Sequence, residues 1–222
     1  MLYDSAIYVC KVSQKLKNLR NFSIFASKQS KQVTFIRNAM IEELLQHNRN
    51  FVETQGFRKF ETSKYPDKKI AIVTCMDTRL VELLPAALGL RNGDVKMIKN
   101  AGGTITNPFD STMRSLLVAV YELGVNEIMI IGHTGCGVQG MNASKMLGLM
   151  RSRGVSDEHI GLMRHCGIDL DSWLHGFDRT DDAVRETVDL VKNHPLMPAD
   201  VRVGGYIIDT LTGELSVVCR EE

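Results

Sequence analysis

Residues 69–75 read KIAIVTC, and residues 126–132 read NEIMIIG. Each is a short, continuous apolar run of strand length, which is typical of a strand buried on both faces of a parallel sheet. A further strand is expected at residues 94–100, and helices are expected between the strands at residues 80–88 and 110–123. This alternation predicts an α/β fold with a central, mostly parallel sheet and right-handed crossovers.

The rest of the chain adds flanking helices and one hairpin. Apolar spacing predicts helices at residues 40–53, 138–152 and 180–193, and strands at residues 201–209 and 214–219. The two strands are joined by a short turn and are expected to form a C-terminal antiparallel edge. Residues 153–180 have broken apolar spacing and several glycines, so no element is predicted there.

Two short motifs follow two of the predicted strands. They are CMDTR at residues 75–79 and HTGC at residues 133–136. Cysteine thiolates and neutral histidine are zinc ligands, and the two residues between His133 and Cys136 give a short chelate spacing. Active sites of open parallel sheets form at the carboxyl ends of strands, so Cys75 is expected to join these two ligands at one zinc ion.

The expected zinc site also predicts the order of the strands. Cys75 follows the first strand and the other two ligands follow the third. These strands must therefore be neighbours, about 4.8 Å apart. The predicted order is 2-1-3-4, with the metal where the chain crosses over.

Three protein ligands leave one coordination position open, which is typical of catalytic zinc. Asp77 is expected to fill that position or to stand beside it. Arg79 can bind the carboxylate of Asp77 in two places and keep it ionised and oriented. Two thiolates make the site formally neutral, so water there is expected to be acidified less than at a three-histidine site.

Each of these residues alone has a simpler interpretation. A buried free cysteine is commonly a small apolar residue, a single histidine after a strand more often packs or hydrogen-bonds, and Asp77 with Arg79 could be a plain ion pair. Their joint occurrence at strand ends favours zinc. His165 and Cys166 are adjacent in the unassigned segment and are interpreted as surface or packing residues.

Composition limits the classes of function. The chain of 222 residues has a formal net charge of +1, which argues against a nucleic-acid-binding protein, and no apolar run is long enough for a membrane span. It has five cysteines, an odd number in a chain of ordinary globular size. A disulfide framework is therefore not expected, and the chain is expected to reside in a reducing, cytoplasmic compartment.

Residues 1–39 differ from the rest of the chain. From Lys11 to Arg37 there are seven basic residues and no acidic ones, a composition also seen in transit peptides. The favoured interpretation is a disordered extension, or one that precedes a working start at Met40. The chain is thus divided into this extension, residues 1–39, and one α/β domain, residues 40–222.

The paired motifs resemble those of the β-carbonic anhydrases. Cys-x-Asp-x-Arg, Asn-Ala-Gly at residues 100–102 and His-x-x-Cys follow one another, and the resemblance runs from about residue 68 to residue 138. It implies an enzyme with one Zn²⁺ per subunit that reversibly hydrates carbon dioxide to bicarbonate and a proton.

The resemblance also implies roles for other residues. Asp77 and Arg79 would take part in catalysis, with Asp77 either on the metal or paired with Arg79. Gly102 and Gly103 would let the backbone approach a substrate pocket. The subunits would assemble as homodimers or homotetramers.

Other functions stay open. Many β-carbonic anhydrases have a pocket glutamine before the first strand, and residues 57–69 contain none. Related proteins with a similar zinc site hydrolyse carbon disulfide or carbonyl sulfide, and a zinc-binding protein without turnover is a further alternative. Redox or phosphatase chemistry at Cys75 is disfavoured, because there is no Cys-x-x-Cys pair and the loop to Arg79 is too short to cradle phosphate.

Overall fold

The computed structural model describes residues 28–220, and the chain divides into two compact units with a boundary between Glu61 and Thr62. The described part of the first unit contains helix α2 (Lys28–Glu53) and the 3-10 helix η1 (Gly56–Phe60). The helix predicted at residues 40–53 is confirmed, but it begins earlier.

The earlier start of α2 has a simple local reason. Residues 28–39 contain no proline or glycine that would end the helix. The division of the chain at residue 39 stays a prediction, and residues 1–27 of the predicted extension lie outside the described residues.

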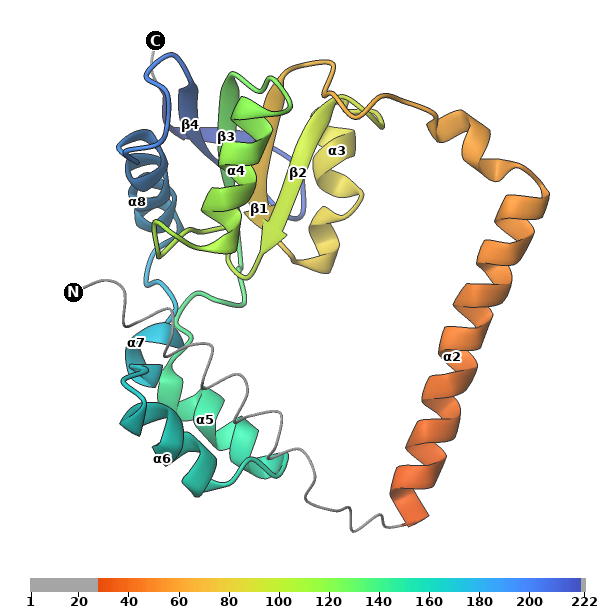
Figure 1. The fold of residues 1–222 in the computed structure, drawn as a ribbon, viewed down its shortest axis with the longest axis vertical. Coiled ribbons are helices and arrows are strands. Elements are labelled where there is room, and N and C mark those ends of the chain that lie inside the picture. Colours follow the sequence, from red (N-terminus) through yellow and green to blue (C-terminus); the bar gives the residue numbers. More distant parts are fainter. Residues whose placement is uncertain (1–27, 221–222) are drawn as a thin grey trace. The chain divides into compact units, whose positions relative to one another are not determined.

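The second unit is built on a five-stranded sheet (Figure 1). The strands are β1 (Ile70–Cys75), β2 (Val95–Asn100), β3 (Glu127–His133), β4 (Arg202–Ile208) and β5 (Leu215–Cys219). Their order is β2-β1-β3-β4-β5, with β4 and β5 antiparallel and the other pairs parallel. The predicted fold class, strand order and closing hairpin are confirmed.

The helices of this unit are η2 (Thr78–Leu80), α3 (Leu83–Ala87), α4 (Ser111–Tyr121), α5 (Ala143–Ser152), α6 (Asp157–His165), α7 (Leu170–Trp173) and α8 (Thr180–Lys192). The helices predicted near residues 80–88, 110–123, 138–152 and 180–193 are present, and two further helices, α6 and α7, form where no element was predicted. The carboxylate of Asp110 accepts a hydrogen bond from the backbone N–H of Met113 at 2.7 Å and caps α4.

Helices cover both faces of the sheet. Alternate residues of β1 point to opposite faces: Val73 packs in a cluster with side chains of α4 and α8, whereas Ile72 packs with Leu80 and Leu84 on the side of η2 and α3. Both faces of the central strands are therefore buried, which explains their continuous apolar sequences.

Residues 153–180, for which no element was predicted, contain α6 and α7, and these two helices form a separate layer together with α5. Helices α5, α6 and α7 share their own apolar cluster, which includes Leu147, Ile160 and Leu170, and Figure 1 shows them grouped apart from the sheet. The entry and exit of this layer are joined by backbone hydrogen bonds from Gly140 to Phe177 and from Gly176 to Met141. We call residues 142–174 the helical insertion.

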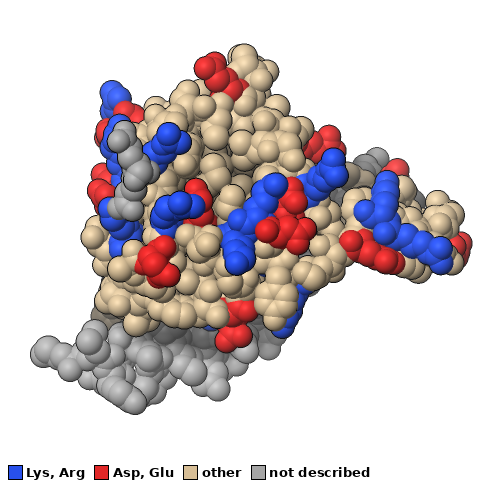
Figure 2. Space-filling model, turned by 90° about the horizontal axis from the view of Figure 1, so that it is seen from above, with Lys and Arg blue, Asp and Glu red and all other residues tan. Residues whose placement is uncertain are grey.

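Two features of the surface bear on function. Among residues 28–220, no helix has both the length and the apolar character needed to cross a bilayer. On the face seen in Figure 2, basic and acidic side chains are interspersed rather than gathered by sign.

Candidate metal centre

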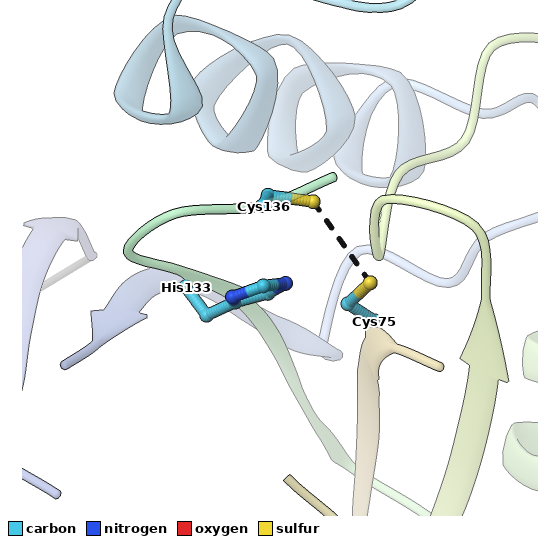
Figure 3. A group of neighbouring side chains, drawn as sticks. All are labelled: Cys75, His133 and Cys136. Atoms are coloured by element: carbon cyan, nitrogen blue, oxygen red, sulfur yellow. Dashed lines mark hydrogen bonds between the residues drawn. The ribbon is translucent and has the colours of Figure 1, made fainter. Parts of the chain in front are cut away.

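Cys75, His133 and Cys136 meet at the carboxyl ends of β1 and β3. The two strands are adjacent and parallel, with Thr74 paired to Ile131, so their last residues reach the same edge of the sheet. The potential ligand atoms of the three residues lie within 4.8 Å of one another. The convergence that the sequence predicted for these three residues is present, and Figure 3 shows both sulfurs and the imidazole facing one another.

The three side chains are buried. Their exposed fractions are 5% for Cys75, 0% for His133 and 6% for Cys136. The two Sγ atoms are 3.9 Å apart, and the Cys–Cys pair is free rather than oxidised. Burial raises the pKa of the Cys136 thiol, and the neighbouring Cys75 adds to this effect. A metal ion binding here would have to displace a proton.

His133 has one ring nitrogen satisfied and one without a partner. Its Nδ1 lies 3.0 Å from the backbone oxygen of Thr134, so we assign the Nδ1–H tautomer that donates to this carbonyl. Its Nε2 is buried and has no hydrogen-bond partner among residues 28–220. A buried acceptor without a partner costs free energy. In the assigned tautomer Nε2 carries a lone pair, and together with the two neighbouring sulfurs it forms a set of donor atoms that suits a zinc ion.

Gly135 lets the ligand loop turn between His133 and Cys136. Its φ is 63°, in the left-handed region that favours glycine. The backbone carbonyl of Gly135 also accepts a hydrogen bond from Arg79 Nη2 at 2.9 Å. The ligand loop and the CMDTR segment are therefore in direct contact.

Asp77 and Arg79 form a bidentate ion pair beside the three ligands. Arg79 donates from Nε to Oδ1 at 2.9 Å and from Nη2 to Oδ2 at 2.8 Å, and its backbone N–H donates to Oδ1 at 2.9 Å. These bonds hold the pKa of Asp77 well below its ordinary value, and those from the Arg79 side chain have the largest effect. Partial burial of the carboxylate opposes this shift.

Asp77 stands next to the ligand cluster without belonging to it. Its Oδ2 is 3.9 Å from Nε2 of His133, and, in the part of the chain that the structure describes, the cluster of close ligand atoms consists of the two cysteines and the histidine. Asp77 as a fourth metal ligand therefore stays a prediction, as do catalytic roles for Asp77 and Arg79.

The two glycines predicted to border a substrate pocket lie against the centre. A Cβ on Gly103 would lie 2.8 Å from the backbone nitrogen of Cys75, and the φ of Gly103 is 68°. A Cβ on Gly102 would meet Phe177 and Val138 at 3.2 and 3.4 Å. Their role toward substrate stays a prediction.

A cavity of about 500 Å³ lies next to Gly102. Val138 and Phe177 line it, together with Thr104 and residues of α8. Sequence reasoning did not single out these residues, because an apolar side chain in a loop has no motif that marks it as part of a cavity.

Two threonines near Arg79 were also missed. Thr210 accepts a hydrogen bond from Arg79 Nη1 at 3.2 Å, and the hydroxyls of Thr210 and Thr134 are 3.2 Å apart. Thr134 lies inside the HTGC motif, which could have drawn attention to it. Thr210 lies 131 residues from Arg79 along the chain, and no sequence signal links the two.

The fold and this centre define a class: an α/β protein with a parallel sheet and a three-ligand metal site at adjacent strand ends. The family model described as carbonic anhydrase matches residues 70–215. The chain belongs to the carbonic anhydrase family, and its resemblance to the β class is confirmed by its relatives.

Three similar proteins illustrate the relationship. The Bacillus subtilis protein named "Putative carbonic anhydrase YtiB" is 47% identical over 180 residues, covering 81% of this chain and 96% of its own. The crystal structure of β-carbonic anhydrase isoform I from Trichomonas vaginalis has a TM-score of 0.75 at 33% identity, covering 82% of this chain and 98% of that one. A carbon disulfide hydrolase of Acidithiobacillus thiooxidans is 28% identical over 178 residues, 75% of this chain and 80% of its own.

Proposed function

We propose that this protein is a carbonic anhydrase that reversibly hydrates carbon dioxide to bicarbonate and a proton, with one Zn²⁺ per subunit. The observation that carries the proposal is the convergence of two buried thiols on the unpartnered Nε2 of His133. Cys75, His133 and Cys136 would hold the ion. Zinc bound there would supply Lewis acidity and activate water as a nucleophile near neutral pH.

Asp77 and Arg79 would set the access to the metal. Arg79 holds the Asp77 carboxylate ionised at 2.8 Å from Nη2, with its Oδ2 3.9 Å from Nε2 of His133. The same carboxylate could turn to the metal and close the site, or stay on Arg79 and leave it open. Gly102 and Gly103 would keep the pocket wall free of side chains beside the ligands.

The cellular setting is part of the same proposal. Cys75, Cys136, Cys166 and Cys219 are all free thiols, which supports a reducing, cytoplasmic location. Helix α2 carries exposed apolar side chains, among them Ile41, Leu44 and Val52. Such side chains support assembly into a homodimer or homotetramer.

The test measures zinc content and carbon dioxide hydration by stopped flow. We expect wild type to hold about one zinc ion per chain, as three-ligand sites do, and to be active. Cys136→Ser should lose both properties. Cys166→Ser is the matched control, because Cys166 lies outside the ligand cluster, and it should keep both. Zinc-loaded wild type without hydration at any pH would contradict the proposal.

Hydrolysis of carbon disulfide or carbonyl sulfide is the second candidate. It is favoured by the relatives named carbon disulfide hydrolase, at 27–29% identity, and by the absence of glutamine in residues 57–69. Assays with carbon dioxide and carbon disulfide on the same preparation separate the two. Zinc with no turnover of either substrate would indicate a zinc-binding protein without activity.

A further inference from the structure

The turn between β4 and β5 reaches the Asp77–Arg79 pair. Arg79 Nη1 donates a hydrogen bond to Thr210 Oγ1 at 3.2 Å. The other groups that Arg79 contacts with its guanidinium are the Asp77 carboxylate and the carbonyl of Gly135. Thr210 is therefore the contact that ties Arg79 to the C-terminal hairpin.

The hydrogen bonds around Thr210 have one consistent direction. Arginine can only donate, so Thr210 Oγ1 accepts from it, and the Thr210 proton is left for Thr134. The Oγ1 atoms of the two threonines are 3.2 Å apart, and Thr134 Oγ1 donates in turn to Asp209 Oδ2 at 3.4 Å. A chain of donors thus runs from the guanidinium through two hydroxyls to a carboxylate, and the backbone oxygen of Thr134, 3.4 Å from Thr210 Oγ1, is a second acceptor for the Thr210 proton on the same ligand loop.

The far end of this chain is firmly held. Asp209 Oδ1 accepts hydrogen bonds from the backbone N–H groups of Leu211 and Thr212, both at 2.8 Å. These bonds hold the pKa of Asp209 below its ordinary value, and the bond from Thr212 has the largest effect. The carboxylate is therefore ionised at neutral pH. The backbone N–H of Thr210 also donates to Thr134 Oγ1 at 3.0 Å, which fixes the turn against the ligand loop.

We infer that Thr210 is a positioning residue that holds Arg79 in place and, through Arg79, keeps the Asp77 carboxylate away from the ligand cluster. Asp77 Oδ2 is 2.8 Å from Arg79 Nη2 and 3.9 Å from His133 Nε2. A small movement of the carboxylate would therefore decide whether it stays paired with Arg79 or reaches the ligand cluster. A contact that restrains Arg79 favours the open arrangement. The inference rests on the proposed function, because it assigns a role at the same site.

The test compares three variants of the full chain. Thr210→Val removes the hydroxyl and keeps the branched shape, and Thr210→Ser restores the hydroxyl. Thr212→Val makes the same change in the same turn, where the hydroxyl contacts Asp209 and the N–H of Glu214 but not Arg79. Thr210→Ala, which also lacks the hydroxyl, replaces Thr210→Val if the latter does not fold.

Two measurements are made on each variant. The first is kcat/KM for carbon dioxide hydration by the zinc-loaded protein. The second is the Kd of azide for the cobalt-substituted protein, followed by visible absorption, because azide needs the position that Asp77 would otherwise take.

We expect Thr210→Val to lower kcat/KM and to raise the azide Kd, each about five-fold, which corresponds to about 1 kcal/mol, the net contribution of one typical hydrogen bond. Thr210→Ser and Thr212→Val should stay within about two-fold of wild type, a smaller change than the loss of one such bond.

The outcomes separate this inference from the function. Azide binding to Thr210→Val that equals wild type would overturn it, and so would an equal loss in Thr212→Val, which would indicate a general effect on the turn. If zinc-loaded wild type shows no hydration, the proposed function fails, whereas the azide titration still decides the role of Thr210.

Discussion

Within residues 28–220, two regions carry a histidine and a cysteine close together in sequence, and one of them belongs to a cluster of three potential metal ligands. At the end of β3, His133 and Cys136 are buried and meet Cys75 from the neighbouring strand. At the end of α6 in the helical insertion, His165 is exposed and Cys166 is the half-buried C-cap residue. Within residues 28–220, the cluster of three potential ligands is the one at the sheet. The difference shows that a second element, and not the pair itself, makes the site.

The largest expected effect tests the contribution of that second element. Cys75→Ser should weaken zinc binding by more than about 100-fold, beyond what loss of a partner outside the ligand set costs, although His133 and Cys136 stay intact. Competition with a chromophoric chelator measures it. Cys166→Ser should bind zinc as wild type does, and equal losses in the two variants would remove the distinction between the regions.

The next effect concerns the ion pair beside the ligands. Asp77→Asn should keep zinc and lower kcat/KM for hydration roughly ten-fold, because Arg79 loses the charge that fixes it and the site loses its alignment. The chain offers a matched control on α8, where Arg179 binds Asp181 from Nε at 3.2 Å and from Nη2 at 2.7 Å. Asp181→Asn should leave kcat/KM unchanged. Loss of zinc in Asp77→Asn would show instead that the carboxylate is needed to hold the metal.

Replacing a glycine by alanine should change the free energy of unfolding in opposite directions in the two regions. Gly103→Ala places a Cβ 2.8 Å from the backbone of Cys75 at a positive φ and should destabilise the fold by about 2 kcal/mol. Gly161, inside α6, has open space around its Cβ position, so Gly161→Ala should stabilise by about 0.5–1 kcal/mol. Urea unfolding of the two variants gives both values, and a Gly103→Ala variant as stable as wild type would contradict the close approach of Gly103 to the backbone of Cys75.

The smallest expected effect depends on pH. The folded pKa of Asp209 lies below its ordinary value, so its stabilisation is present above the unfolded pKa and is lost as pH falls through the folded pKa. Asp209→Asn should therefore lower the unfolding temperature of the metal-free protein by a few degrees at pH 7, and the difference should shrink below about pH 4.

The helical insertion again offers a control. Asp169 caps α7 with bonds to the N–H groups of Asp171 and Ser172, both at 3.1 Å and so longer than those of Asp209. Asp169→Asn should therefore lower the unfolding temperature at pH 7 by less than Asp209→Asn does. A difference between wild type and Asp209→Asn that persists unchanged at pH 3 would show that the charge of Asp209 is not its source.

The sheet and the meeting of the three ligands could be predicted from sequence because each rests on local patterns. Apolar runs placed β1 and β3, and the need of Cys75 to reach the HTGC motif fixed their adjacency, which the observed order β2-β1-β3-β4-β5 confirms. The Asp77–Arg79 pair follows from a separation of two residues. In these cases the contact is either short in sequence or required by the chemistry.

The parts that could not be predicted depend on packing between distant or weakly patterned segments. Helices α6 and α7 are 9 and 4 residues long and are stabilised by their shared cluster rather than by an apolar period of their own. The contact between Arg79 and Thr210 joins positions 131 apart. Only the folded hairpin brings them together, so no pattern along the chain marks them as neighbours.

The parallel pairing of β1 with β3 has a consequence for the order of events during synthesis and maturation. The thiols at positions 75 and 136 are 61 residues apart, and closing so long a loop of flexible chain has an entropic cost. An unfolded chain can offer zinc little more than the short chelate at 133–136. Zinc can therefore bind with its full affinity only after β1 and β3 have paired. A chain that has bound zinc is thus one in which the middle of the sheet has already folded.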